Sequence, residues 1–386
     1  MSIVLPVPKK RPDLLIIAGE HSGDEHAAEI LKQLLILRPG LKVSALGGKK
    51  LKEVGADLLW DLTESSVVGL LEVLKNYTFF KELFDAIFNW IKSYKPKTIC
   101  FVDYPGFNLR LAKKLFEEKL CDKAGGAIKL CYYIGPQIWA WKSKRRFAMA
   151  KYLNSLGVIF PFEVDCYKDT DLDVHFVGHP FLLPDYHSPI KFDAKGPILL
   201  LPGSRKIAVS RIFPIMLDAF ELLLQPYPNE QALVIYPTEK IKSVLENCLS
   251  KKKALKNKIK LCQCNTKNAI SGKALLGSSG TMSLACALAG IPGAILYKAN
   301  MFTYIIGRMI VDIDKLGMAN ILLKETVYPE YIQNDANSKI LNDELIECIK
   351  SPKRREEILI QANKLRNLLI SADKLGAAEW LSSCVD

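Results

Sequence analysis

The chain has 386 residues, of which 49% are hydrophobic and 24% are charged, so two domains with large cores are expected rather than one. It contains no apolar run of roughly 18 residues or more, and its first ten residues lack the apolar core of a signal peptide, so neither a spanning helix nor a secretory leader is expected. The net charge of +12 favours anionic partners such as nucleic acid, anionic lipid or phosphorylated small molecules.

The ten cysteines are scattered along the chain, and several lie in apolar runs, as Cys100, Cys131 and Cys286 do. This usage is typical of reduced, buried thiols in a cytosolic protein. Cys262 and Cys264 form a pair without a second pair nearby, so alternate positions of a strand explain them better than a zinc site.

The first half of the chain alternates between predicted strands and helices. Leu14–Ala18 is a continuous apolar run, followed by a polar turn with two glycines and by helical periodicity over Glu29–Leu37. Further predicted strands are Val43–Leu46, Thr98–Val102, Lys129–Tyr133, Ser155–Ile159 and His175–Val177. This alternation predicts a doubly wound parallel sheet. The first turn lacks the Gly-x-Gly-x-x-Gly fingerprint, so no dinucleotide is inferred.

One predicted helix has an unusually aromatic face, formed by Phe79, Phe80, Leu83, Phe84, Ile87, Phe88 and Ile91. Core packing is the usual explanation for such a stripe. Flanking lysines and the preceding apolar run Val67–Leu71 favour the alternative, a membrane-surface patch.

A Pro-rich stretch, Pro184–Pro189, indicates a domain linker. A second alternating series follows, with predicted strands at Ile198–Leu201, Ala232–Tyr236, Lys258–Cys262, Ala274–Leu276 and Gly293–Tyr297. We therefore expect an α/β protein of two doubly wound, Rossmann-like domains, 1–185 and 186–386, that face each other across a ligand cleft.

Asp103 ends an apolar strand and is followed at once by Pro105 and Gly106. In open α/β sheets, chemistry collects just beyond the carboxyl ends of strands, and a carboxylate held there by a stiff turn can act as a general base. The alternative is an aspartate that starts a turn or caps the next helix.

Two loops of the second half are suited to anions. Ser279-Gly280-Thr281 opens a helix, where backbone amides and hydroxyls could hold a phosphate, and Arg205 follows a strand end, where it could neutralise a diphosphate. Each also has a structural explanation, an N-cap for the first and a surface ion pair for the second. Together with a carboxylate in the other domain, they form the set that sugar transfer from a nucleotide donor requires: cations for the leaving diphosphate and a base for the acceptor hydroxyl.

Seven motifs in this order resemble the lipid-A-disaccharide synthase family, which is glycosyltransferase family 19 of the GT-B type. They are Ala18–Asp24, Asp103–Leu109, Pro136–Trp141, Phe160–Glu163, Phe176–Pro180, Leu200–Arg205 and Ser279–Thr281. The resemblance extends from about Leu14 to Gln333.

This resemblance implies an inverting glycosyltransferase that joins UDP-2,3-diacylglucosamine to 2,3-diacylglucosamine 1-phosphate (lipid X) and releases lipid A disaccharide 1-phosphate and UDP. It implies that Asp103 is the base and that Glu20, Ser22, Asp24, Asn108, Gln137, Trp139 and His179 bind substrate. For the UDP side it implies Arg205, Ser279, Gly280, Thr281, Asn320 and Gln333.

The resemblance further implies a cytoplasmic, peripheral enzyme on the inner face of the inner membrane, and it favours a membrane or acyl-chain contact for Val67–Ile91. No metal, cofactor or nucleic-acid partner is expected. The tail after Ser351 is expected either to return to the first domain or to exchange with a partner chain in a homodimer.

Three positions depart from the family pattern: Ala27 replaces a glycine, and Ala208 and Ala285 replace glutamates. An acid at the position of Ala285 often bonds the nucleotide ribose, and its loss is expected to weaken donor binding by about one to two orders of magnitude. Two alternatives therefore stay open: a GT-B enzyme with another donor or acceptor, such as an epimerase, and a non-catalytic lipid-binding homologue.

Overall fold

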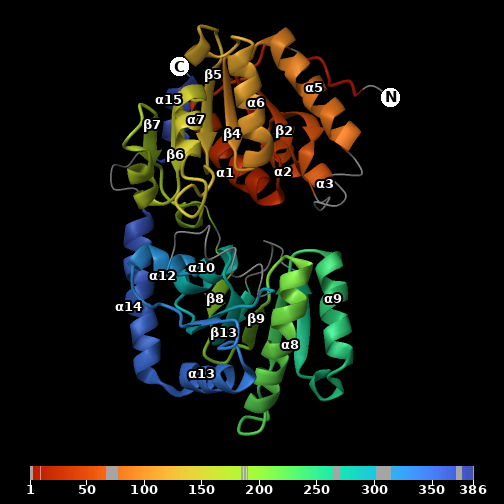
Figure 1. Cartoon of the computed structure of the whole chain (residues 1–386), viewed down its shortest axis with the longest axis vertical. Helices are drawn as coiled ribbons and strands as arrows, with labels where there is room; N and C mark the ends of the chain where they lie inside the picture. Colours follow the sequence, from red (N-terminus) through yellow and green to blue (C-terminus); the bar gives the residue numbers. More distant parts are fainter. Residues whose placement is uncertain are drawn as a thin grey trace. The chain divides into compact units, whose positions relative to one another are not determined.

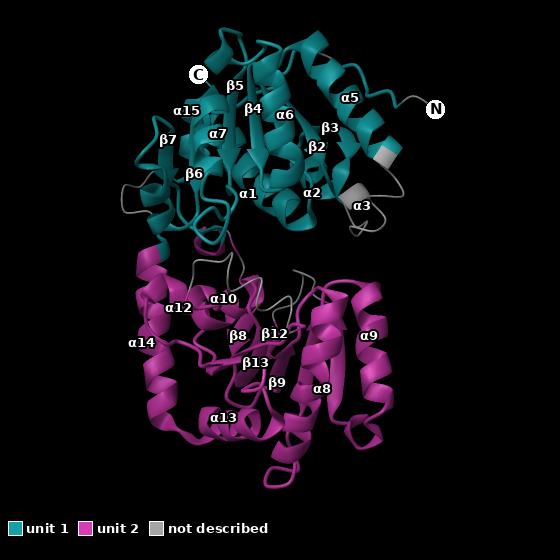
Figure 2. Ribbon diagram, in the orientation of Figure 1, with its two compact units in different colours: residues 1–180, 369–386 teal, residues 181–368 magenta. Residues whose placement is uncertain are grey.

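The computed structural model describes residues 3–8, 10–66, 77–183, 186, 188, 190–263, 270–300, 314–370 and 376–385. The chain divides into two compact units (Figure 2), which are described separately. Unit 1 comprises Met1–Pro180 and Leu369–Asp386, and unit 2 comprises Phe181–Leu368. The division falls at 180/181, where the sequence analysis placed it at 185/186, and the C-terminal tail belongs to unit 1 of the same chain. The apolar run Val67–Leu71, Cys264 and part of the stretch 184–189 lie outside the described residues.

Unit 1 is built on a seven-stranded sheet with the order β3-β2-β1-β4-β5-β6-β7 (Figure 1). The strands are β1 (Leu14–Ala18), β2 (Val43–Gly47), β3 (Asp57–Asp61), β4 (Thr98–Val102), β5 (Lys129–Tyr133), β6 (Ser155–Val158) and β7 (Asp173–Phe176). All neighbouring strands pair in parallel.

Helices cover both faces of this sheet. Alternate residues of each strand point to opposite sides, and apolar residues on both sides are buried under helices. Leu15 and Ile17 of β1 pack in one core with residues of α5 (Tyr77–Tyr94), α6 (Pro105–Glu117) and α7 (Arg145–Tyr152), whereas Leu14 and Ile16 pack in another core with α1 (His21–Leu37) and α15 (Ala377–Val385). Shorter helices are α2 (Lys49–Glu53), α3 (Leu62–Ser66), η1 (Asp122–Ala124), η2 (Pro161–Tyr167) and η3 (Pro180–Leu182).

The C-terminal helix α15 is part of the core of unit 1. Trp380 is fully buried, and its indole N–H donates to the Ser155 hydroxyl at 2.9 Å. A Cβ added to Gly157 would lie 3.0 Å from the Trp380 ring. The Trp380 ring therefore packs closely against β6 at Gly157, where a side chain would crowd it.

Unit 2 contains a six-stranded parallel sheet with the order β11-β10-β9-β13-β14-β15 and a small pair, β12-β8. The strands are β8 (Ile190–Phe192), β9 (Ile198–Leu201), β10 (Ala232–Tyr236), β11 (Ile259–Gln263), β12 (Ile270–Gly272), β13 (Ala274–Ser278), β14 (Gly293–Tyr297) and β15 (Glu330–Ile332). The helices are α8 (Lys206–Leu223), α9 (Glu239–Ser250), η4 (Lys253–Leu255), α10 (Thr281–Leu288), α12 (Met318–Leu323), α13 (Ser338–Lys350) and α14 (Pro352–Leu369).

Both units thus have the doubly wound parallel architecture that the sequence predicts. Among the helices of the described residues, none combines the length and the apolar character that crossing a membrane needs.

Candidate active site

The strand order of unit 1 reverses between β1 and β4. Loops that leave the carboxyl ends of two such strands diverge, and α/β proteins bind ligands in the crevice that results. Glu20 lies in the loop after β1, and Asp103 directly follows β4. A Cβ added to Gly23, in the first turn of α1, would lie 3.9 Å from the Cβ of Asp103. The predicted base and the predicted first loop therefore lie together.

The backbone of Asp103 is held in an uncommon conformation. Asp103 and Tyr104 have φ angles of 45° and 51°, in the left-handed region that non-glycine residues rarely adopt. The Asp103 carbonyl accepts hydrogen bonds from Asn108 Nδ2 at 2.7 Å and from the Tyr132 hydroxyl at 2.5 Å. Asn108, predicted to bind substrate, thus positions the backbone of Asp103. Nothing in the sequence distinguishes Tyr132 from the other residues of the predicted strand Lys129–Tyr133.

The environment of the Asp103 carboxyl group favours its neutral, protonated form. Burial raises its pKa to about 6, and the negative charge of the nearby Glu20 contributes to the rise. A carboxylate with a pKa near the working pH is a better general base than an ordinary aspartate, because its affinity for a proton is higher. Above pH 6 the carboxyl group of Asp103 is mostly ionised and can accept a proton. Glu20 and Ser22 are both exposed.

Tyr104 packs directly against the β1–α1 loop. A Cβ on Gly19 would lie 2.1 Å from the Tyr104 ring, so only glycine permits this approach. The Tyr104 ring also stacks on Phe107, with centroids 5.8 Å apart. The contact fixes the loop that carries Glu20 beside the turn that carries Asp103.

Asp24 is 3% exposed, and its carboxylate bonds the first residues of α2 and the glycine before them. It accepts hydrogen bonds from the backbone N–H groups of Gly48 at 2.7 Å, Lys50 at 3.0 Å and Leu51 at 3.3 Å. These contacts cap the N-terminus of α2, where a carboxylate is favourable. Asp24, in the first turn of α1, therefore links the start of α1 to the start of α2.

Gln137, Trp139 and His179 lie in two different environments. Gln137 is exposed, whereas the Trp139 indole donates to Glu163 Oε1 at 3.2 Å and His179 is 4% exposed, its ring 5.4 Å from Phe160. Burial and the neighbouring His26 lower the pKa of His179 to about 3, so its imidazole is neutral at physiological pH.

Burial also raises the pKa of Glu163 to about 7. Glu163 ends the motif Phe160–Glu163, and the sequence alone gives its carboxyl group no role. It bonds Trp139 and the Phe160 backbone N–H, the latter at 3.1 Å, and so holds the aromatic turn together.

In unit 2 the strand order reverses between β9 and β13. The loop after β9 contains Gly203, with a φ angle of 101°, and Arg205. A Cβ on Gly203 would lie 2.8 Å from the Ser278 hydroxyl at the end of β13. The two predicted anion loops are therefore neighbours.

Both loops present groups suited to a diphosphate. Gly280 is the N-cap of α10, and Gly280 and Thr281 are exposed. The first amides of a helix have no partner within it and carry partial positive charge. Arg205 is the exposed N-cap residue of α8, and within the described part of the chain its guanidinium makes no ion pair.

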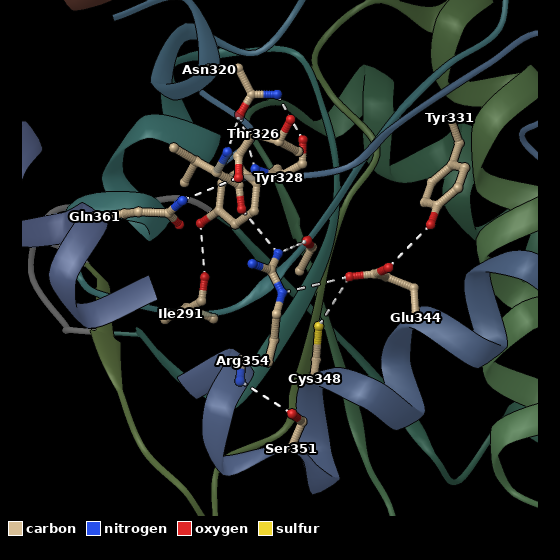
Figure 3. Close-up of polar contacts among 12 residues, drawn as sticks. Ile291, Asn320, Thr326, Tyr328, Tyr331, Glu344, Cys348, Ser351, Arg354 and Gln361 are labelled. Carbon is tan, nitrogen blue, oxygen red and sulfur yellow. Dashed lines mark hydrogen bonds and ion pairs between the residues drawn. The ribbon is translucent and has the colours of Figure 1, made fainter. Parts of the chain in front are cut away.

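Asn320 is buried in a polar network at the end of the sheet (Figure 3). Its Oδ1 accepts from the backbone N–H groups of Val327 and Tyr328, each at 2.9 Å, and its Nδ2 donates to the Tyr328 carbonyl and to Glu330 Oε1, each at 2.7 Å. Glu330 in turn accepts from the Leu316 and Gly317 amides before α12. All of the hydrogen-bonding capacity of Asn320 is thus directed to the protein itself.

Gln333 has a similar arrangement. Its side chain accepts from the Ala299 N–H at 2.8 Å and donates to the Ala299 carbonyl at 3.2 Å, and its backbone N–H donates to Tyr297 at 2.8 Å. Gln333 therefore fixes the chain that leaves β14.

We expect Asn320→Ala to lower the free energy of unfolding by about 3 kcal/mol, because it leaves buried backbone and carboxylate groups without partners. Urea unfolding measures this loss. Asn334→Ala, at an exposed site nearby, should change the free energy by no more than about 0.5 kcal/mol. Normal stability of Asn320→Ala combined with lost UDP binding would instead assign Asn320 to the ligand.

Each of the three departures from the motif pattern lies on a packed helix surface. Ala285 is 3% exposed and lies in the wall of a pocket of about 280 Å³ with Phe192, Leu288 and Arg366 among its lining. Ala27 is 2% exposed in the core of unit 1, and Ala208 packs half-buried against the core of unit 2.

The predicted aromatic face of α5 divides into two parts. Leu83, Ile87, Phe88 and Ile91 are buried in the core of unit 1, so core packing accounts for these four. Phe84 is partly buried and packs against the same core, whereas Phe80 is half-buried and Phe79 is exposed.

The described residues contain no group of three or more His, Cys, Asp or Glu side chains arranged to hold a metal ion.

Comparison with known proteins identifies the family. Residues 14–379 match the family model of lipid-A-disaccharide synthetase. Lipid-A-disaccharide synthase 1 of Legionella pneumophila is 35% identical over 382 residues, which cover 93% of this chain and 94% of that protein. Lipid-A-disaccharide synthase of Coxiella burnetii is 31% identical over 385 residues, covering 96% of this chain and 97% of that protein.

Solved structures share the fold at low sequence identity. UDP-GlcNAc 2-epimerase from Neisseria meningitidis bound to UDP-GlcNAc has a TM-score of 0.61 at 11% identity, covering 95% of this chain and 97% of that chain. A calicheamicin glycosyltransferase has a TM-score of 0.55 at 11% identity, covering 98% of each chain. These similarities show that the fold is GT-B. The family match and the curated relatives establish that the chain belongs to the lipid-A-disaccharide synthetase family and is a glycosyltransferase of lipid A biosynthesis.

Proposed function

We propose that this enzyme transfers 2,3-diacylglucosamine from its UDP derivative to 2,3-diacylglucosamine 1-phosphate, with inversion at the anomeric carbon. The observation that carries the proposal is Asp103, a carboxyl group with a raised pKa at the switch point of unit 1. As the acceptor 6-hydroxyl attacks, its proton passes to Asp103, and the bond between the sugar and UDP breaks with the electron pair on the diphosphate.

Unit 2 supplies the positive charge for this leaving group. Arg205 and the first amides of α10, beside Ser279, Gly280 and Thr281, stabilise the charge that develops on the diphosphate. Asn320 and Gln333 act indirectly, by fixing the segments before α12 and after β14. In unit 1, the exposed Glu20, Ser22 and Gln137 are left for contacts with the acceptor sugar.

The direct test is UDP release by the purified protein from UDP-2,3-diacylglucosamine, with and without the monophosphate acceptor. Release that needs the acceptor supports the transferase and shows that Ala208 and Ala285 are compatible with turnover. Release that does not need the acceptor would point to hydrolysis of the donor, and no release from folded protein would contradict the proposal.

The pKa of Asp103 predicts the pH dependence. We expect kcat/KM to fall about tenfold per pH unit below pH 6, since the protonated base is inactive. Glu20→Gln removes a negative charge that raises this pKa, so the acid limb should move to lower pH, whatever happens to the absolute rate. Glu29→Gln, in the helix α1 that follows Glu20, should leave the limb unmoved. A limb at the same pH in Glu20→Gln would contradict the assignment.

We also propose that the enzyme works at the cytoplasmic surface of the inner membrane. Trp141 and Phe147 are 44% and 51% exposed. Lys142 Nζ lies 4.4 Å from the Trp141 ring centroid, and the Arg145 guanidinium lies 5.2 Å from the same centroid. Exposed aromatic rings among cations suit an anionic membrane interface.

Vesicle sedimentation tests this surface. The protein should bind vesicles that contain anionic phospholipid, more weakly at high salt, and bind purely zwitterionic vesicles poorly. The double variant Trp141→Ala/Lys142→Ala should bind about tenfold more weakly. Ile36→Ala, at another exposed apolar residue, is the matched control. Equal binding by the double variant would exclude this patch.

A further inference from the structure

Unit 1 contains a pocket of about 320 Å³ where α5 meets the start of α6. Its lining consists of Phe80, Lys81, Phe84, Tyr104, Gly106, Phe107 and Arg110. The residues contributed by α6 follow Asp103 within one turn or two, so the pocket belongs to the same region of the fold as the proposed base.

The apolar part of the pocket is built from interlocked aromatic rings. Phe84 of α5 packs edge-on against Phe107 of α6, with centroids 5.5 Å apart, and Tyr104 stacks on the same Phe107 ring. Such pairs hold ring positions before a ligand arrives. A preformed aromatic wall suits hydrocarbon, whereas a sugar hydroxyl would find few partners on it.

The pocket starts one residue after Asp103. Tyr104, in its left-handed conformation, packs on Gly19 in the loop of Glu20 and also lines the pocket. A molecule that enters the pocket and continues past Tyr104 therefore reaches the carboxyl end of β4. This continuity indicates that the pocket and the base serve one substrate.

Two cations line the same pocket. Lys81 and Arg110 are exposed, and within the described ranges neither side chain forms an ion pair. Lysine and arginine without a carboxylate partner are available for a phosphate, and arginine can bind it through two hydrogen bonds. An aromatic wall with two such cations fits a ligand with both a hydrocarbon chain and a phosphate.

We propose that this pocket binds one acyl chain of the phosphorylated acceptor, and that Arg110 and Lys81 bind the phosphate of the same molecule. The inference rests on the proposed function, because it assigns the pocket to the acceptor of that reaction. The volume is at the lower end for ligand pockets and holds part of one chain, so the second chain lies elsewhere.

This assignment predicts how the acceptor KM depends on chain length. Burying each methylene strengthens binding about fourfold. The test uses acceptors acylated with acetyl, butyryl, hexanoyl and octanoyl chains, each assayed below its micelle concentration. When both chains are lengthened by one methylene, the acceptor KM should fall about fourfold, because only one of the two chains is buried. A factor near sixteen would mean that both chains are buried.

Gly106 allows the pocket to be closed without strain. It lines the pocket, has no positive φ angle, and a Cβ added there meets no atom within 4 Å. Gly106→Leu should fill the pocket and abolish the dependence of acceptor KM on chain length. Gly106→Ala, which adds one methyl group, should keep most of it. Varying the donor chains at fixed acceptor should give the same slope in both variants.

The proposed phosphate contact is tested by one variant of α6 and a control variant of the same helix. Arg110→Gln should raise the KM of the phosphorylated acceptor about tenfold and leave that of an acceptor lacking phosphate unchanged. Lys113→Gln, at a residue 58% exposed and paired with Glu117, should affect neither.

The outcomes separate this inference from the proposed function. Equal chain-length slopes in the wild type and Gly106→Leu would overturn the pocket assignment while leaving the transferase intact. If no acceptor is turned over, calorimetry with the same series of acceptors, in the absence of donor, still decides. Binding by the wild type with the chain-length factor, lost in Gly106→Leu, would support the pocket, and its absence would overturn it.

Discussion

Asp103→Asn should lower kcat by about 10²–10⁴-fold, the contribution expected of a general base. The amide cannot accept the proton of the attacking hydroxyl, yet it has nearly the same shape as the carboxyl group. UDP binding should remain at the wild-type level, because the proposed nucleotide site belongs to unit 2. Acceptor-dependent UDP release and calorimetry with UDP give the two readouts.

The structure predicts that this variant folds normally. Asp103 has a φ angle of 45°, and asparagine is among the non-glycine residues that best tolerate this region. The bonds from Asn108 and Tyr132 reach the Asp103 carbonyl rather than its side chain, so the substitution keeps both. Asp103→Asn with kcat within a few-fold of the wild type would remove Asp103 from the role of base.

Asp103→Asn should raise the free energy of unfolding although it lowers kcat. The pKa of Asp103 is about 6 in the folded protein and 3.8 as the reference value, so ionisation opposes folding, and its cost is complete above pH 6. Below the reference pKa the carboxyl group is neutral in both states, and no cost remains. Asp103→Asn should therefore be more stable than the wild type at pH 8, and this difference should fade as the pH falls from 6 to 4.

The central strands of both sheets are predictable because each is buried on both faces. Leu14–Ala18 is an unbroken apolar run, and Thr98–Val102 has four apolar residues after Thr98; both appear as strands with the predicted bounds. The edge strands β3 and β15 carry no such signal. Asp57–Asp61 has an acid at each end, and Glu330–Ile332 has only three residues. Their pairing depends on neighbours already in place.

The site shows the same division between local and distant information. Asp103 can be found from its place after a strand, since position alone brings it to the switch point. The contacts of Asp24 and Gln333 cannot be found this way, because each joins segments far apart in sequence: Asp24 to Gly48 and Gln333 to Ala299. A motif identifies such residues as important, but only the fold shows whether they contact backbone or ligand.

Arg205→Ala should weaken UDP binding by about 10- to 100-fold, because a hydrogen bond between charged groups contributes roughly 1.5–3 kcal/mol. Ala208 stands three residues later, where the resemblance leads one to expect a glutamate, so the α8 surface offers Arg205 no acid at that position. Its charge is therefore available to the diphosphate.

The shape of the group matters as well as its charge. Arg205→Lys keeps the charge but loses the planar pair of donors that matches a phosphate, so it should restore only part of the affinity.

Lys195→Ala, at an exposed lysine of the same unit, should leave UDP affinity within twofold and so control for net charge. Calorimetry at two salt concentrations separates specific contact from general attraction, since only the latter fades strongly with salt. Unchanged urea midpoints in all three variants are expected, because Arg205 is exposed. UDP affinity of Arg205→Ala equal to that of Lys195→Ala would place the diphosphate away from the loop after β9.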